Sequence, residues 1–271
     1  MPPPHKQILK LYAAPDRMEA GCDEAGRGAL ISRVMAGAVI FPAELATDRN
    51  PDNLCNKIRD SKKVPPVVRE RLYDFIKENA IAAATGWADE KEIDEINIRV
   101  ATMRSFHRAI DALTIRPHHL LIDGPYFDEY VCPQRAVAIP HTCIIQGDNA
   151  FVSIAAASIL AKVERDRYIR ALCDKEPLLN ERYGLLRNMG YGTADHSKGI
   201  AKWGTTPYHR QSFGICKTGG IPTTVIARAE EKARTEARNL GIEYLDTTTI
   251  NEIECVTSLA DILESEFDEF K

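Results

Sequence analysis

Several features are missing from this 271-residue sequence, and each absence excludes a class of protein. No apolar run approaches the roughly 18 residues that a membrane-spanning helix needs, so we expect no membrane insertion. Residues 1–11 have a proline run and lysines but no apolar core, which argues against a secretory signal. The seven cysteines are odd in number and include no C-x-x-C pair. This argues against a disulfide framework or a zinc site and favours a reducing, cytoplasmic compartment, with a nuclear or organellar one left open.

The sequence also lacks a strong net charge, internal repeats and low-complexity tracts, but its charge is uneven. The formal net charge is −4, and residues 217–271 contain 12 acidic and only 6 basic residues. The remaining body is slightly basic and can bind a polyanion if its cations cluster. Residues 217–222 have the composition of a linker. We therefore predict one domain over residues 1–216 and an acidic, helical C-terminal extension over residues 217–271. That extension either packs on the domain, remains solvated or docks a protein partner.

The hydrophobic periodicity predicts alternating strands and helices. Expected strands are 19–22 leading into 23–24, 32–41, 81–88, 119–122, 136–139 and 142–145, and expected helices are 67–79, 90–113 and 150–171. A glycine-rich tight turn is expected between the first two strands. This order is typical of an α/β fold with a mixed sheet flanked by helices.

Acidic residues stand at the ends of three of these strands: Asp23-Glu24, Asp123 and Asp148. Taken singly, each could cap a helix or solvate a turn. Brought together at one sheet edge they would repel, and oxygen ligands favour Mg²⁺ or Mn²⁺. Successive strand residues point to opposite faces, so Asp23 and Glu24 can serve one site only if the strand bends or ends there.

Six motifs in order turn these positions into a recognisable pattern. They are Gly21–Gly28, Arg59–Lys63, Leu121–Gly124, Gly147-Asp148 with Ser153–Val163 and Arg165-Asp166, Gly190–Thr193 with His196, and His209–Phe213. Together they resemble type 2 ribonuclease H (ribonuclease HII) of the single-chain bacterial type.

The resemblance implies a ribonuclease H-like fold and a metal-dependent endonuclease. Its catalytic and metal-binding residues would be Asp23, Glu24, Asp123 and Asp148, holding two Mg²⁺ or Mn²⁺ ions. Such an enzyme hydrolyses the RNA strand of RNA–DNA hybrids and incises duplex DNA 5′ of embedded ribonucleotides, as in ribonucleotide excision repair and DNA replication. Two ions account for products with 3′-OH and 5′-phosphate ends. We expect a monomer whose partner is the hybrid or ribonucleotide-containing duplex.

The resemblance also implies substrate-binding residues: Gly26, Arg27, Gly28, Lys62, Lys63 and Tyr191. A ribonucleotide is told from a deoxynucleotide by its 2′-OH, and glycines let backbone groups approach it closely. Tyr191 would pack on the sugar at the RNA–DNA junction, and Lys62 and Lys63 would contact phosphates. Taken alone, the tyrosine could equally be half-buried packing and the lysines a solvated surface. His196, His209 and Arg210 receive no assigned role.

Two departures from the family pattern lie near these residues. Ser32-Arg33 stands where the family has Gly-Pro, and Met189 replaces a lysine before G-Y-x-T. They motivate an alternative, a protein that binds hybrids but has weakened or lost cleavage. Type 3 ribonuclease H ranks third, because that family carries an additional N-terminal domain and only about 20 residues precede Asp23 here.

Overall fold

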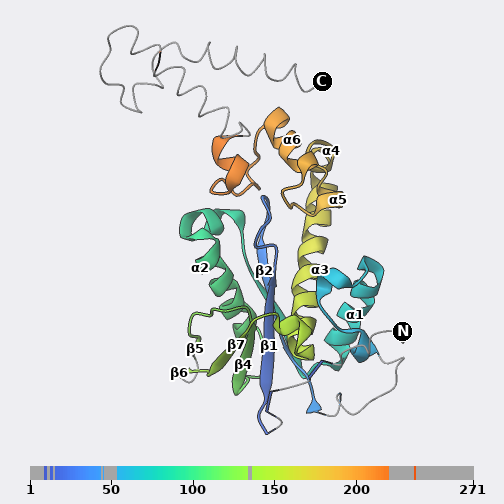
Figure 1. The fold of residues 1–271 in the computed structure, drawn as a ribbon, viewed down its shortest axis with the longest axis vertical. Coiled ribbons are helices and arrows are strands. Elements are labelled where there is room, and N and C mark those ends of the chain that lie inside the picture. Colours follow the sequence, from blue (N-terminus) through green and yellow to red (C-terminus); the bar gives the residue numbers. More distant parts are fainter. Residues whose placement is uncertain are drawn as a thin grey trace.

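A five-stranded mixed sheet forms the centre of the computed structural model, which describes residues 9–10, 13–14, 16–43, 45, 54–133, 136–219 and 235 (Figure 1). The strand order is β3-β2-β1-β4-β7. β1 is antiparallel to β2 and parallel to β4, β2 is antiparallel to β3, and β4 is parallel to β7. The strands are β1 Glu19–Ala25, β2 Val34–Ile40, β3 Ala82–Ala88, β4 His119–Asp123 and β7 His141–Ile144. A separate pair, β5 Val131–Cys132 and β6 Val137–Ala138, is antiparallel.

Helices cover both faces of this sheet, as expected for an α/β fold. α2 (Glu90–Asp111) packs on one face, and α3 (Val152–Lys175) with α1 (Pro66–Asn79) packs on the other (Figure 1). Glycines let α3 come close to the sheet, because a Cβ on Gly21 would lie 2.2 Å from the Ser153 carbonyl carbon. The long helix is thereby fixed directly under the middle strands.

Two local expectations from the sequence were wrong. The helix predicted over 90–113 is interrupted at Asn97, whose φ is 67° and whose Oδ1 accepts hydrogen bonds from the N–H groups of Arg99 and Val100. The Asn97 backbone therefore lies outside the helical region, and its side chain caps the second half of the helix. The connection between β1 and β2 is no tight turn but a loop over residues 26–33.

Short helices that the periodicity did not predict gather at the far end of α3 (Figure 1). These are α4 Leu178–Tyr183, α5 Leu185–Asn188 and α6 Ala194–Trp203. They enclose a small apolar cluster with residues from the end of α3, among them Ile169 and Leu172. Single 3-10 turns complete the described fold: η2 Leu54–Lys57, η3 Ser61–Lys63, η4 Gly147–Asn149 and η5 Gly214–Thr218.

The predicted C-terminal extension over 217–271 lies outside the described residues, apart from residues 217–219 and 235. The predicted boundary at 216 falls within η5. Within the described residues, no helix combines the length and apolar character needed to cross a bilayer.

Candidate active site

The sheet topology brings the sequence-predicted carboxylates to one edge. The last residue pair between parallel β1 and β4 is Cys22 with Ile122, so Asp23 and Asp123 occupy the next position on neighbouring strands. β7 lies on the other side of β4, and η4, which carries Asp148, follows it. Residues remote in sequence therefore come close together, because the pairing of β1 with β4 stops just before Asp23 and Asp123, and β7 ends at Ile144 beside Asp123.

The strand carrying Asp23 and Glu24 ends on one side only. Its pairing with β4 stops at Cys22, whereas its pairing with β2 continues regularly through Ala25. On its β4 side the strand therefore ends at these residues, and the two carboxylates lie in different surroundings. Asp23 is buried, whereas Glu24 forms an ion pair with Arg27 at 3.6 Å.

Burial raises the pKa of all four carboxyl groups, and the charge of a neighbouring carboxylate adds to this at Asp23, Glu24 and Asp148. For Asp23 the causes are desolvation, then the charges of Glu24 and Asp123, and its pKa lies well above the usual value. Desolvation also raises the pKa of Glu24, against the opposing effect of Arg27. Desolvation is also the largest cause of the raised pKa at Asp123 and at Asp148. At Asp148 the charges of Asp60 and Asp123 raise the pKa further. The four groups thus form one electrostatically coupled cluster.

The donor chemistry of this cluster fits hard divalent cations, because it offers carboxylate oxygens that gain from added positive charge. In the arrangement seen, the oxygens bind neighbouring N–H groups instead. Asp23 Oδ1 accepts from Glu24 N at 2.7 Å, Asp123 Oδ1 from Gly147 N at 2.7 Å, and Asp148 Oδ1 from Asn149 Nδ2 at 2.8 Å. Over the part of the chain that is described, no three Asp, Glu, His or Cys side chains are arranged as a metal site.

A cavity of about 400 Å³ opens beside Glu24 and contains most of the sequence-predicted substrate residues. Its lining consists of Glu24, Ala25, Gly26, Arg27, Gly28, Ser61, Lys62, Ser158, Lys162 and Tyr191. Lys63 does not line it, because its Nζ donates to Asn149 Oδ1 at 2.8 Å and lies 3.4 Å from Asp60. Lys63 thus adjoins the Asp148 turn, whereas Lys62 faces the cavity.

Two buried arginines hold the loop that carries the Gly-Arg-Gly element. Arg210 donates to the carbonyl oxygens of Arg27, Ala29 and Ser32 at 2.8–3.0 Å. Arg165 lies against Gly26, where an added Cβ would be 2.0 Å from its Nε and where φ is +85°. Both arginines are fully buried. The backbone of the element is therefore fixed by side chains from elsewhere in the chain.

Arg165 also reaches the two places where the sequence departs from the family pattern. Its guanidinium donates to the carbonyl oxygens of Arg33 at 3.1 Å and Met189 at 2.8 Å. The Arg33 side chain is stacked between two aromatic rings, with its Cζ 3.7 Å from the Trp87 centroid and 3.9 Å from that of Tyr168. The backbone at Arg33 and at Met189 is therefore held by hydrogen bonds, although both residues differ from the family pattern.

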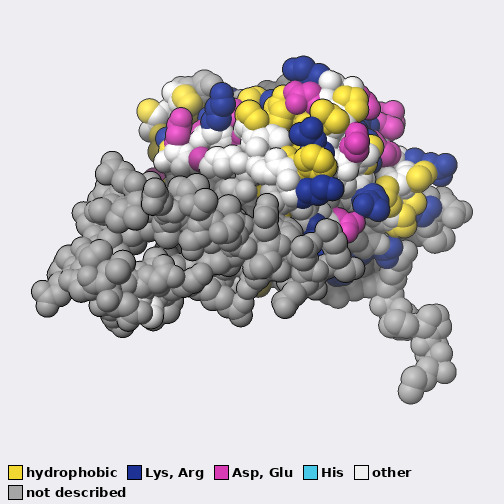
Figure 2. All heavy atoms as spheres, turned by 90° about the horizontal axis from the view of Figure 1, so that it is seen from above, with side chains coloured by type: hydrophobic (Ala, Val, Ile, Leu, Met, Phe, Trp, Pro, Cys, Tyr) yellow, Lys and Arg dark blue, Asp and Glu magenta, His cyan; other side chains and the backbone are white. Residues whose placement is uncertain are grey.

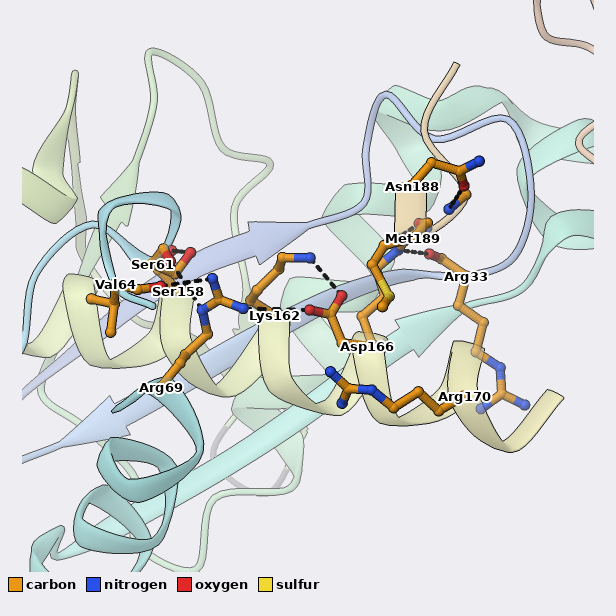
Figure 3. A network of polar contacts seen from close by, with 12 residues as sticks. Arg33, Ser61, Val64, Arg69, Ser158, Lys162, Asp166, Arg170, Asn188 and Met189 are labelled. Carbon is orange, nitrogen blue, oxygen red and sulfur yellow. Dashed lines mark hydrogen bonds and ion pairs between the residues drawn. The ribbon is translucent and has the colours of Figure 1, made fainter. Parts of the chain in front are cut away.

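A polar network at the cavity includes residues to which no specific role was assigned from the sequence (Figure 3). Ser61 Oγ lies 2.9 Å from Ser158 Oγ, and Lys162 Nζ donates to Asp166 Oδ1 at 2.5 Å. Arg69 of α1 donates to the Ser61 carbonyl at 3.0 Å and lies 3.4 Å from Asp166. The network ties η3, which carries Lys62, to α3. Its members lie inside or next to the sequence motifs, but only the folded contacts show what they do.

Surface charge does not mark a nucleic-acid track on the face seen from above. In Figure 2 the Lys and Arg side chains of the described residues are mixed with acidic and apolar ones. Proteins that bind nucleic acid through charge alone usually show a clustered basic surface. The cations that can bind a polyanionic substrate are those of the cavity, which is lined by Arg27, Lys62 and Lys162.

Comparison with known proteins identifies related sequences and folds. The ribonuclease HII family model matches residues 20–216. The ribonuclease HII of Bacteroides thetaiotaomicron is 44% identical over 214 residues, covering 79% of this chain and 98% of that protein. The one from Parabacteroides distasonis is 45% identical over 208 residues, covering 77% and 96%. Ribonuclease H2 from Pyrococcus horikoshii shares the fold, with a TM-score of 0.60 at 23% identity over 75% of this chain and 97% of that one.

Proposed function

The chain belongs to the ribonuclease HII family and is an endoribonuclease acting on the RNA of RNA–DNA hybrids, and we propose that Asp23, Glu24, Asp123 and Asp148 are its catalytic carboxylates. The observation that carries this proposal is their electrostatic coupling at one sheet edge, beside a cavity lined by Gly26, Arg27, Gly28 and Tyr191. Repulsion among buried carboxylates is retained only where something compensates it.

We propose that the four carboxylates hold two Mg²⁺ or Mn²⁺ ions. When bound, such ions activate the attacking water and stabilise the leaving 3′ oxygen. Lys62 favours the deprotonated form of two of them, since its charge opposes the rise in the pKa of Asp123 and Asp148. Incision on the 5′ side of a ribonucleotide would leave 3′-OH and 5′-phosphate ends.

Recognition of the ribose is proposed for the backbone of residues 26–28. This segment lines the cavity next to Glu24, and its glycines allow close approach of a 2′-OH. Arg165 and Arg210 hold its backbone in place from behind. A preorganised reader of this kind can select one hydroxyl, because a substrate lacking it leaves polar groups unpaired.

The other cavity residues would contact the rest of the substrate. Lys62 and Arg27, which line the cavity, would bind phosphate oxygens, and the Tyr191 ring would pack on the sugar at an RNA–DNA junction. Lys63 would support the Asp148 turn through Asn149 as well as contact phosphate.

Some expectations remain predictions. A protein partner for residues 217–271 is one of them, because nearly all of that segment lies outside the described residues. A solved complex of PCNA with the ribonuclease HII of Archaeoglobus fulgidus has a similar fold, with a TM-score of 0.51 at 24% identity over 76% of this chain and 91% of that one. The monomeric state and the cytoplasmic location also stay predictions.

Cleavage of two defined substrates tests the proposed function. One is a DNA duplex with a single ribonucleotide and the other a continuous RNA–DNA hybrid, each incubated with Mg²⁺, Mn²⁺ or EDTA. Wild-type protein should cut with a cation, and Asp123→Asn should lower the rate by about 100-fold or more. Asp195→Asn changes an exposed aspartate whose ion pair among the described residues is with Arg187, and it serves as the matched control.

Two results would contradict the proposal. If the wild-type protein cuts neither substrate with either cation but binds hybrids in EDTA, the binding-only alternative holds. If Asp123→Asn retains the activity of Asp195→Asn, the catalytic assignment of the carboxylate cluster is wrong.

A further inference from the structure

Two histidines without an assigned role form a buried pair behind the cavity. His196 lies in the first turn of α6, which Thr193 caps, and His209 lies in the loop that follows that helix. Their Nε2 atoms are 3.2 Å apart, and each side chain is at most 1% exposed. The ring of Tyr183 packs against both, with centroid distances of 5.9 and 4.9 Å.

The hydrogen bonds of this pair allow one arrangement of protons. The Thr206 N–H can only donate, so His209 Nδ1, 2.9 Å away, must accept and its proton must be on Nε2. That Nε2–H donates to His196 Nε2, which leaves the proton of His196 on Nδ1. The partner of His196 Nδ1 is the Tyr191 carbonyl at 3.1 Å, which can only accept. The result is a directed relay from Thr206 through both rings to Tyr191.

Both imidazoles must be neutral for the relay to form. If both Nε2 atoms carried protons, two donors would face each other at 3.2 Å. The surroundings favour the neutral forms, since burial lowers the pKa of His196, and burial together with His196 lowers the pKa of His209 to about 3. The relay is therefore intact throughout the neutral range.

The relay ends at the residue whose ring lines the cavity, and the same segments bracket the Gly-Arg-Gly loop. Leu30 N donates to the Gly190 carbonyl at 2.9 Å, and Arg210 N donates to the Leu30 carbonyl at 2.9 Å. Ala29 bridges to Tyr191 and Ile31 bridges to His209. Residues 29–31 thus lie between the Tyr191 segment and the His209 segment, and the histidine pair closes this layer from behind.

We propose that His196 and His209 are positioning residues that fix Tyr191 relative to the 2′-OH reader and thereby set the preference for single embedded ribonucleotides. The inference rests on the proposed contact between Tyr191 and the substrate sugar. A histidine pair serving only as core packing would have no reason to end its hydrogen bonds on this carbonyl, and an apolar pair would fill the space without burying polar nitrogens.

Imidazole ¹⁵N spectra of the full wild-type chain test the relay without relying on activity. Long-range ¹H–¹⁵N correlations distinguish a protonated nitrogen from an acceptor nitrogen. We expect the proton of His196 on Nδ1 and that of His209 on Nε2, with both rings neutral at pH 7. If His196 is protonated on Nε2, the inference fails, whether or not the protein cuts hybrids.

Kinetics test the consequence for specificity. Asparagine places its amide near the position of Nδ1, so His196→Asn should keep the donor to Tyr191, whereas His196→Leu removes it. For His196→Leu we expect kcat/KM on the single-ribonucleotide duplex to fall about 10-fold, because small displacements of a positioned group cost that much or more. For the same variant, kcat/KM on a long hybrid should fall less than about 3-fold. His196→Asn should restore the wild-type ratio of kcat/KM on the single-ribonucleotide duplex to that on the long hybrid.

A double-variant cycle completes the test. Tyr191→Ala should change the substrate ratio in the same direction, and adding His196→Leu to it should cause no further change if the histidine acts through Tyr191. The inference is overturned if the two effects multiply. It is also overturned if His196→Leu lowers kcat/KM on both substrates equally and in proportion to its loss of thermal stability. A wild-type chain that cuts neither substrate would instead defeat the proposed function, on which the specificity effect depends.

Discussion

Ser32 is the position where we expect one substitution to stabilise the protein. Its φ is 74°, its side chain is fully buried, and its hydroxyl has no hydrogen-bond partner among the described residues. A side chain in the left-handed region costs about 1–2 kcal/mol, and an unpaired buried hydroxyl costs about 1 kcal/mol or more. Ser32→Gly removes both costs and restores the residue that the family pattern has at this position.

The net effect is smaller than this sum. Glycine makes the unfolded chain more flexible, which costs about 0.5–1 kcal/mol of the free energy of unfolding. We therefore expect Ser32→Gly to gain about 1–2 kcal/mol, at about 2–4 °C in Tm per kcal/mol for a domain of this size. Ser32→Ala is the matched control, because it removes the hydroxyl but keeps a Cβ at the same φ, and it should gain about 1 kcal/mol or less.

Thermal unfolding followed by circular dichroism, together with urea titration, measures these differences. The expected order of stability is Ser32→Gly, then Ser32→Ala, then wild type. If Ser32→Ala equals or exceeds Ser32→Gly, backbone strain is not the cause. A loss of stability in Ser32→Gly would show that the loop depends on the serine itself.

Three further predictions concern the site. Because burial and neighbouring charges raise the pKa of Asp23, the folded chain binds this proton more tightly than the unfolded chain, and metal-free stability falls as pH rises above about 4. In denaturation curves from pH 4 to 8, Asp23→Asn should show a smaller loss of stability with rising pH than the wild type. The variant should be inactive, and without metal it should be more stable than the wild type at pH 7. A steeper loss of stability with pH in the variant would contradict this. Gly26→Ala should cost about 2 kcal/mol or more in urea titrations, whereas Gly28→Ala, whose Cβ would meet nothing within 4 Å, should cost less than half of that; equal losses would rule out the clash with Arg165. The free energy of unfolding of the wild-type protein should be about 2–3 kcal/mol lower in EDTA than at a cation concentration near 100 times Kd. If Asp123 holds the ions, scanning fluorimetry should show a much smaller difference between these two conditions for Asp123→Asn.

The main elements could be predicted from sequence because their signals are local and repeated. The helices α1 and α3 begin within two residues of their predicted starts, and β1, β3 and β4 fall where apolar runs end in glycine or acid. α4, α5 and α6 were not predicted, since short helices offer too few turns for a period to appear. The break at Asn97 was missed because an asparagine within a helical pattern is also compatible with a continuous helix.

The candidate site was predictable in its residues but not in its contacts. Asp23, Asp123 and Asp148 stand out as strand-end acids, yet their meeting depends on parallel pairing of β1 with β4 and of β4 with β7, which no local pattern specifies. Lys62 and Lys63 look equivalent in sequence and differ in the structure, since only Lys62 lines the cavity. Pairing and side-chain direction are set by the whole fold, and so they lay beyond the sequence.

The departures from the family pattern show where this fold is tolerant. The 26–33 loop keeps its conformation because Arg165 and Arg210 donate to its carbonyl oxygens, and carbonyl oxygens are present whatever the side chain. Ser32 can therefore occupy a strained position, and Met189 can contribute a carbonyl while its side chain packs with apolar neighbours. Replacing either arginine should disturb the proposed 2′-OH reader more than replacing the loop residues they hold, except at Gly26, where an added Cβ would clash with Arg165.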